Sequence, residues 1–526
     1  MISELFYYRI ATFLSCEASF HILKLLEERN VTMLFNSVQF FAFFPIVMLL
    51  YIVIPKKAKM YWLLVASYFF YMCWNPKYIV LILFTTVVTY IAGLLIGRAA
   101  ETSAKKFWLV SAIVVNLAVL FTFKYLDFFF LNLNKILSLA GIRAVDKPFD
   151  FLLPVGISFY TFQAIGYVVD VYRGDSQAEK NFFKYALFVS FFPQLVAGPI
   201  ERSGKLIKQI DDLGKRRLWS YKGVVSGLGM MLWGLFVKMV IADRIAIFVD
   251  AVHSDIYAAG TIETFIAMLG FSIQIYADFA GYSAVAIGAA RIIGIDLMEN
   301  FNTPLFATSI ADFWRRWHIS LTTWFRDYIY IPLGGNRRGK ITKYRNIMVT
   351  FLISGLWHGA SWKYVVWGGI HGVYQIIADI VKPLRDWIDD KLKVQKNVFS
   401  YRFGKVLGTN LLVSFALIFF RAGSLKLALK YILRMFTKWN PWVIFNDSLY
   451  NWGLNHFEVG ILFASLVLLL FVSIVRYKQQ LDIGEFLFKQ NMAFRWAVFI
   501  LLLVAIIVFG EYGAEFASNK FIYFDF

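Results

Sequence analysis

The chain has 526 residues, of which 59% are hydrophobic and 19% are aromatic, and its mean hydropathy is +0.62. An ordinary soluble domain has about 45–50% apolar residues, so this composition excludes a soluble globular protein and indicates a polytopic membrane protein. The net charge of +19 is better explained by basic cytoplasmic loops than by nucleic-acid binding. The two cysteines, Cys16 and Cys73, have neither disulfide-framework nor metal-ligand spacing, so no metal site is expected.

The first 32 residues differ from the remainder of the chain because charged residues are scattered through them. Met1–Thr32 lacks the basic start and unbroken apolar core of a signal peptide. Leu14–Glu28 could form an amphipathic interfacial helix. We favour another interpretation, in which residues 1–32 are an extension that results from an upstream translation start. Met33 then opens a single membrane domain that extends over residues 33–526.

Long apolar runs with few charges predict membrane-crossing helices, since about 20 residues cross a bilayer core. The runs are Phe40–Ile54, Tyr78–Ile96, Phe107–Phe123, Met230–Ile241, Leu411–Phe420, Val459–Val475 and Trp496–Phe509. Clusters of Lys and Arg residues lie between these runs, and such clusters favour the cytoplasmic side of a membrane. All of them can lie on that side if two stretches, Phe182–Pro199 and Phe313–Pro332, enter the membrane without crossing it. The sequence therefore predicts an all-α membrane protein with about twelve transmembrane helices and additional re-entrant or interfacial helices around a central channel.

Three polar clusters interrupt the apolar frame. The first, Pro154–Gln163, ends in an amide, and the third, Gln274–Ser283, contains the carboxylate of Asp278. The second, Phe192–Arg202, is too rich in Pro and Gly for a simple helix and is a candidate re-entrant segment that lines a cavity. Gln163 and Asp278 either line a channel enclosed by protein or hydrogen-bond neighbouring helices together.

A fourth cluster, Asp312–Arg338, alternates basic and aromatic residues with apolar ones. This pattern is typical of a helix that lies at the cytoplasmic membrane interface. Its arginines either anchor lipid phosphates or receive an anionic cytoplasmic molecule, such as a CoA ester or an acyl carrier protein. The candidate donor-binding or channel-lining residues of this region are Asp312, Arg315, Arg316, Trp317, Asn336 and Trp357.

His358 lies in the apolar run Phe351–Trp362, where an ionisable side chain is costly and therefore predicts a functional site. Its unperturbed pKa of about 6.5 allows proton transfer near neutral pH. His318 precedes it by 40 positions, and the two imidazoles could face one cavity from opposite sides. Alternatively, His358 forms a hydrogen bond that holds two helices together and does no chemistry. His371 is interpreted as a residue that packs helices together in this way. No role is assigned to the histidines expected in loops or in the extension, which are His21, His253 and His456.

With these motifs in view, the chain resembles the membrane-bound O-acyltransferase superfamily, and within it the bacterial alginate O-acetylation branch. The resemblance runs from about Met33 to the end of the chain. The matching stretches are Leu153–Phe162, Gln194–Pro199, Tyr276–Ser283, Phe313–Leu321, Pro332–Asn336 and Gly355–Gly359. The chain departs from the pattern at Ala277 and Ala280, where Phe and Ser are expected, and at Ala284 and Val285, where Asp and Met are usual. These departures weaken inference about the acceptor and leave the fold expectation intact.

The resemblance implies O-acyl transfer in a multi-pass protein of the bacterial cell membrane, with His358 as the catalytic histidine and His318 as the accompanying one. This fits the chemistry, because a sugar hydroxyl becomes a good nucleophile when a positioned base takes its proton, an effect worth about 10²–10⁴-fold. Nearby tryptophans would exclude water, which would otherwise hydrolyse the donor. No Gly-x-Ser-x-Gly elbow accompanies the histidines, so the sequence does not favour a serine triad.

We expect no cofactor, and an acyl thioester such as acetyl-CoA as donor substrate. The expected partners are this donor, a polysaccharide acceptor or an extracytoplasmic acyltransferase protein, and membrane lipid, with no nucleic acid. The chain has no sizeable soluble domain to hold a polymer outside the cell, which favours the partner protein. Two alternatives remain open: D-alanyl transfer from a carrier protein to teichoic acid, and a transporter with a histidine proton relay. A transporter is expected to show internal repeats in its hydropathy, and none is found.

Overall fold

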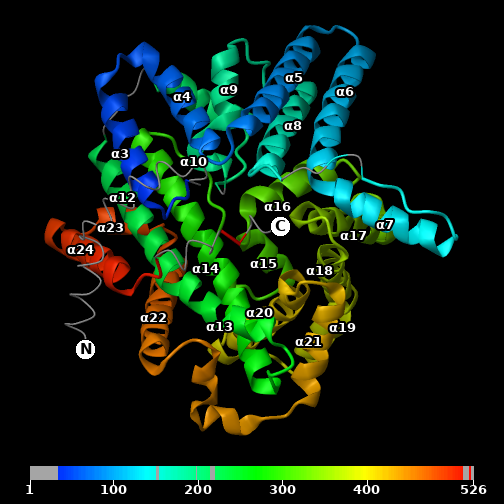
Figure 1. Ribbon diagram of the computed structural model, residues 1–526, viewed down its shortest axis with the longest axis vertical. Coiled ribbons are helices and arrows are strands. Elements are labelled where there is room, and N and C mark those ends of the chain that lie inside the picture. Colours follow the sequence, from blue (N-terminus) through cyan, green and yellow to red (C-terminus); the bar gives the residue numbers. More distant parts are fainter. Residues whose placement is uncertain are drawn as a thin grey trace. The chain divides into compact units, whose positions relative to one another are not determined.

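The computed structural model describes residues 33–147, 149, 153–196, 198–213, 220–512 and 521–522. The described residues are helical, with no strand among them (Figure 1). The all-α prediction is therefore confirmed. The proposed extension, Met1–Thr32, lies outside the described residues, and its interpretation stays a prediction.

The described residues divide into two compact units. The first comprises 33–239, Gly281–Met298 and Leu481–Gly510, and the second comprises Val240–Ala280, Glu299–Gln480 and described residues from 511 onward. The helices of the first unit are α3 (Val38–Val53), α4 (Lys59–Met72), α5 (Ile79–Arg98), α6 (Thr102–Leu120), α7 (Leu126–Leu139), α8 (Ile157–Arg173), α9 (Phe182–Ser190), α10 (Phe192–Leu195), α11 (Ser203–Asp212), α12 (Tyr221–Phe236), α23 (Ile483–Phe488) and α24 (Met492–Phe509).

The second unit contains the predicted histidine pair. Its helices are α13 (Asp243–Ser254), α15 (Ile310–Arg316), α16 (Ile319–Phe325), α17 (Gly339–His358), α18 (Trp362–Ile380), α19 (Lys382–Lys391), α20 (Phe399–Arg421), α21 (Leu425–Thr437) and α22 (His456–Gln479). The 33-residue α14 (Thr261–Ile293) contributes its beginning to the second unit and its end to the first. A π-helical segment, η4 (Val237–Ala242), joins α12 to α13.

Among the described residues, seven helices are long and apolar enough to cross a membrane, and an eighth is added if α18 and α19, which meet at a 47° bend, form one span. The sequence-based count of about twelve is higher. Several apolar helices are short: α3, α4 and α8 have 16, 14 and 17 residues. Such helices rise about 21–26 Å at 1.5 Å per residue, less than the ~30 Å hydrocarbon core.

Both stretches predicted to enter the membrane without crossing it consist of short helices. In the first, α9 has nine residues and α10 has four, with a break at Phe191. In the second, α15 and α16 have seven residues each, and the π-helical segment η6 (Arg326–Tyr330) follows. None of these helices is long enough to span a bilayer.

Glycines bring the backbones of α12 and the end of α14 into contact within the first unit. A Cβ atom at Gly234 would lie 2.5 Å from the carbonyl oxygen of Gly281, and one at Gly288 would lie 2.5 Å from that of Gly227. In each helix the two glycines are seven residues apart, so they lie on one face. Small residues of this kind allow close packing in membranes, where no hydrophobic driving force acts between helices.

The same device joins α17 to α18 in the second unit, where the two helices lie side by side (Figure 1). A Cβ atom at Gly355 would lie 2.2 Å from the carbonyl oxygen of Tyr364, and one at Gly368 would lie 2.2 Å from that of Phe351. Gly359, directly after α17, has equally little space beside the Tyr364 ring. The end of α17 therefore lies close to α18, and His358, its last residue, contacts Trp367 of α18.

Candidate active site

His358 is the last residue of α17, and its side chain is 3% exposed. Its imidazole lies edge-to-face against three aromatic rings, with centroid distances of 4.9 Å to Trp357, 5.0 Å to Trp367 and 5.4 Å to Phe420. Trp367 belongs to α18 and Phe420 to α20, so three helices enclose the ring. A histidine held in this way is shielded from water and fixed in orientation.

His318 lies between α15 and α16 and is 1% exposed. Its backbone has φ 43° and ψ 54°, the left-handed region that residues with a Cβ atom rarely adopt. Its ring lies 4.6 Å from that of Phe279. The residue is outside the candidate membrane spans, and burial lowers the pKa of His318 to about 3. The imidazole is therefore neutral near pH 7 and can accept a proton or a hydrogen bond.

Trp357 connects the two histidines. Its ring centroid is 6.1 Å from that of His318 and 4.9 Å from that of His358. The structure thus brings together three predicted site residues that are separated by up to 40 positions in the chain. Both imidazoles contact one indole. That they face one cavity from opposite sides stays a prediction.

The segment Glu299–Thr303 braces the turn that carries His318. The Asn300 side-chain oxygen accepts a hydrogen bond of 2.6 Å from the Ser320 hydroxyl, and its carbonyl oxygen accepts one of 2.9 Å from the Ile319 amide. Arg476 of α22 holds the same segment by bonding the Glu299 carboxylate at 2.7 Å and the Phe301 carbonyl at 2.7 Å. These residues could not be predicted from the sequence, because an Asn in a short loop belongs to no periodic pattern.

Asp312 and Arg316 also stabilise this turn. The Arg316 guanidinium lies 3.0 Å from the Asp312 carboxylate and donates to the Thr303 hydroxyl and the Asn302 carbonyl at 3.2 and 3.4 Å. Arg315 differs, since its side chain is 74% exposed and lies 3.8 Å from the same carboxylate. Of the two arginines predicted to bind donor or lipid, Arg315 is accessible to solvent, whereas the Arg316 side chain is held by hydrogen bonds within the protein.

A buried asparagine organises the basic loop. Asn346 of α17 donates to the carbonyl oxygens of Leu333 and Gly335 at 3.1 and 2.9 Å. This fixes the turn beside the predicted residue Asn336, which is exposed, as are Arg337 and Arg338 after it. Asn346 follows Lys343 and Arg345 in the basic start of α17, where one more polar residue does not stand out in the sequence.

Two further predicted residues, Gln163 and Asp278, have different surroundings. Gln163 belongs to the first unit, where its amide donates to the Phe188 carbonyl at 2.6 Å, and Gln194 donates to the same carbonyl at 2.8 Å. Both amides thus satisfy a carbonyl near the break between α9 and α10. Asp278 belongs to the second unit and accepts a hydrogen bond of 2.8 Å from the Ile522 amide. These contacts match the helix-bonding alternative for Gln163, and they show that Asp278 fixes the end of the described chain.

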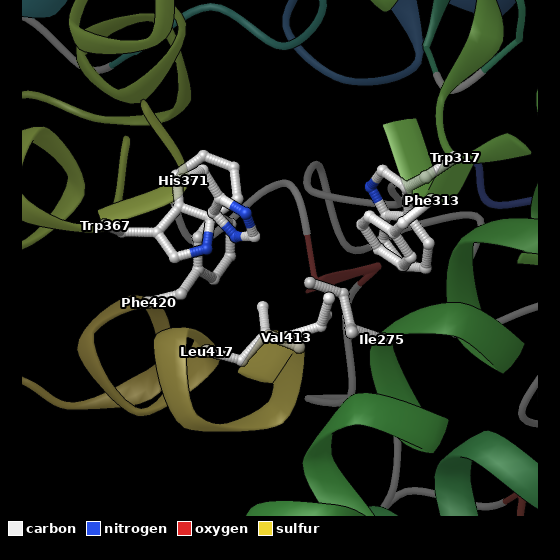
Figure 2. Close-up of a pocket in the computed structure, with 8 residues that line it drawn as sticks. All are labelled: Ile275, Phe313, Trp317, Trp367, His371, Val413, Leu417 and Phe420. Atoms are coloured by element: carbon white, nitrogen blue, oxygen red, sulfur yellow. The ribbon is translucent and has the colours of Figure 1, made fainter. Parts of the chain in front are cut away.

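Two of the rings that contact His358, those of Trp367 and Phe420, line a small apolar cavity (Figure 2). In this view Trp367, His371 and Phe420 lie on one side, Phe313 and Trp317 on the other, and aliphatic side chains lie between them. The cavity volume is about 10 Å³, close to the smallest space that holds one water molecule. Its lining residues are Ile275, Phe313, Trp317, Trp367, His371, Val413, Leu417 and Phe420.

Comparison with known proteins identifies the family. Residues 177–418 match the model of the membrane-bound O-acyltransferase family. The probable alginate O-acetylase of Pseudomonas aeruginosa is 36% identical over 462 residues, which cover 85% of this chain and 83% of the relative. The chain belongs to the membrane-bound O-acyltransferase family. This confirms the resemblance seen in the sequence, and the protein is accordingly a multi-pass membrane acyltransferase of bacteria.

Two further relatives bear on the branch. The peptidoglycan O-acetyltransferase of Helicobacter pylori is 36% identical over 438 residues and covers 77% of this chain and 80% of the relative. The teichoic acid D-alanyltransferase of Bacillus subtilis is 28% identical over 307 residues and covers 56% of this chain and 73% of the relative. Similarity is therefore greater to these O-acetylating relatives than to the D-alanylating one, in agreement with the alginate O-acetylation branch.

Proposed function

We propose that this membrane-bound O-acyltransferase moves acetyl groups from a cytoplasmic acyl thioester toward the hydroxyl groups of a polysaccharide outside the membrane. The observation that carries the proposal is the pair of buried histidines, His318 and His358, which both contact the Trp357 ring. They occur in a chain 36% identical to relatives named as a probable alginate O-acetylase and a peptidoglycan O-acetyltransferase.

His358 is the proposed general base. It takes the proton of the acceptor hydroxyl while the hydroxyl oxygen attacks the thioester carbonyl, and it returns the proton to the departing thiolate. The rings of Trp357, Trp367 and Phe420 keep water from the reacting atoms. His318, neutral and in contact with Trp357, orients the donor or assists proton transfer.

The proposed donor is acetyl-CoA or another acyl thioester, with no resident cofactor. Such a donor is anionic, and the exposed guanidinium groups of Arg315, Arg337 and Arg338 supply positive charge for its capture. Thioesters are made in the cytoplasm and the polymer lies outside, so donor and acceptor reach His358 from opposite sides of the membrane. We also propose a separate extracytoplasmic transferase as partner, because the part of the chain that the structure describes contains no sizeable soluble domain to hold a polymer.

The test uses full-length protein in lipid nanodiscs, supplied with acetyl-CoA labelled in the acetyl group. The labelled acetyl group is expected to pass to an added polysaccharide or to a co-purified partner protein. A parallel reaction supplies a D-alanyl carrier protein, and vesicles containing the protein report proton flux. D-alanyl transfer without acetyl transfer would overturn the acetyl assignment, and histidine-dependent proton flux without any acyl transfer would favour the transporter alternative.

A further inference from the structure

Trp367 places an unused hydrogen-bond donor beside His358. Its side chain is 4% exposed, and among the described residues its indole nitrogen, Nε1, has no hydrogen-bond partner. A buried donor without an acceptor costs about 1–3 kcal/mol. Such a group is therefore uncommon in a folded protein and suggests an acceptor that arrives during function.

The donor lies where a reacting group would be held. The Trp367 ring lines the cavity and meets His358 edge-to-face at a centroid distance of 5.0 Å. In Figure 2 its nitrogen is on the edge of the ring that faces the other lining side chains. Because Val413, Leu417 and Phe420 make the rest of this wall apolar, an N–H group here has few competing partners and a strengthened electrostatic effect.

His371 supplies a second donor to the same cavity. The Trp314 indole N–H donates to its Nδ1 atom at 3.3 Å, linking α15 to α18 as a packing residue would. This bond also makes Nδ1 an acceptor, so the neutral ring carries its proton on Nε2. The His371 and Trp367 rings are 5.1 Å apart, and both line the cavity.

We propose that the cavity receives the carbonyl oxygen of the acyl donor, and that the Trp367 and His371 N–H groups form its oxyanion hole. This inference rests on the proposed function. As the acceptor oxygen bonds to the carbonyl carbon, its proton passes to His358 and the C=O electron pair moves onto the carbonyl oxygen. The two N–H groups stabilise that negative charge. The C–S bond then breaks, the carbonyl re-forms, and the thiolate takes the proton from His358.

The decisive substitution is Trp367→Phe, which keeps an aromatic ring and removes the N–H group. Loss of one oxyanion donor costs about 10²–10³-fold in kcat. We expect a loss of this size with the KM for acetyl-CoA changed less than about twofold, because the interaction forms only in the transition state. Trp367→His restores an N–H group on a smaller ring and is expected to recover at least tenfold over the Phe variant. Trp324→Phe, at an equally buried tryptophan outside the cavity, is the matched control and is expected to retain activity.

The measurement is acetyl transfer from labelled acetyl-CoA by each purified variant in nanodiscs, after gel filtration and a thermal melt confirm folding. Wild-type transfer must be present; its absence would count against the proposed function itself. Wild-type kcat in Trp367→Phe would overturn the oxyanion hole while leaving the function standing. Equal losses in the Phe and His variants, or loss of folding in both, would assign Trp367 to packing and overturn the proposal.

Discussion

At the scale of single residues, the backbone of His318 carries the clearest mark of function. A residue with a Cβ atom in the left-handed region costs roughly 1–2 kcal/mol, and it persists only when its surroundings fix it. Asn300 provides two of the fixing bonds, to the Ser320 hydroxyl and the Ile319 amide. Strained residues of this kind cluster at active sites, so the brace serves to hold the imidazole toward Trp357.

Substitution of Asn300 by Ala is expected to loosen this brace. It removes the acceptor of the Ser320 hydroxyl and leaves a buried donor unsatisfied, which costs about 1–3 kcal/mol. We expect acyl transfer to fall at least tenfold, with part of the loss recovered by Asn300→Asp, which keeps the acceptor oxygen. Ser320→Ala removes the same hydrogen bond from its other end and leaves no buried hydroxyl donor unsatisfied, so it is the milder control. Unchanged kcat in Asn300→Ala, measured on folded protein, would contradict a positioning role.

The pH dependence of stability tests the burial of His318. Its pKa is about 3 in the fold and about 6.5 in an unfolded chain. Between these values the unfolded state binds more protons, so stability is complete above about pH 6.5 and is lost as the pH falls. Thermal melts between pH 7 and pH 5 should show a smaller loss for His318→Asn than for the wild type. Parallel losses would mean that His318 is not buried in its neutral form.

At the scale of elements, the exposed and the engaged arginines should respond differently to substitution. Replacing Arg315, Arg337 and Arg338 by Gln is expected to raise the donor KM about tenfold and leave kcat largely intact. Exposed charge pairs contribute only about 0–1 kcal/mol each, but several act on one polyanionic donor. Added salt should weaken donor binding by the wild type more than by the triple variant. If the donor KM does not depend on salt and is the same in the triple variant, these arginines anchor lipid phosphates and do not bind the donor.

Arg316→Gln should instead lower the melting temperature. Its guanidinium bonds the Asp312 carboxylate, the Thr303 hydroxyl and the Asn302 carbonyl, and all three would lose a partner. We expect destabilisation that is independent of donor concentration, measured by thermal melts with and without acetyl-CoA. A normal melting temperature with a raised donor KM would place Arg316 with the donor-binding group.

The glycine contacts between α12 and α14 give a prediction with a built-in control. Gly234→Ala and Gly288→Ala each place a methyl group 2.5 Å from a carbonyl oxygen, and such overpacking costs about 1–3 kcal/mol. Gly408→Ala on α20 meets nothing within 4 Å, and Ala favours a helix over Gly by up to about 1 kcal/mol. Thermal melts in detergent should therefore fall for the first two variants and hold or rise for the third. Equal effects would show that the helices do not approach so closely.

At the scale of the whole molecule, hydropathy and a few motifs predicted the helical membrane class, the family and the histidine pair. Composition is a global property, and an isolated histidine in an apolar run is a local one, so both are visible in a sequence. The number of membrane-crossing helices was harder to predict, because the apolar runs of short helices such as α3 and α8 resemble those of helices that span the bilayer. The brace from Asn300 and Arg476 and the cavity beside Trp367 depend on contacts between residues far apart in the chain, for which the sequence gives no periodic signal.

His358→Ala is the sharpest test of the proposal that His358 is the base of an O-acyl transfer. The measurement is acetyl transfer from labelled acetyl-CoA by purified protein in nanodiscs, with His456→Ala, an exposed histidine, as the matched control. We predict that His358→Ala folds and inserts normally but loses detectable transfer, while His456→Ala retains wild-type transfer. Transfer at the wild-type rate by folded His358→Ala would contradict the account.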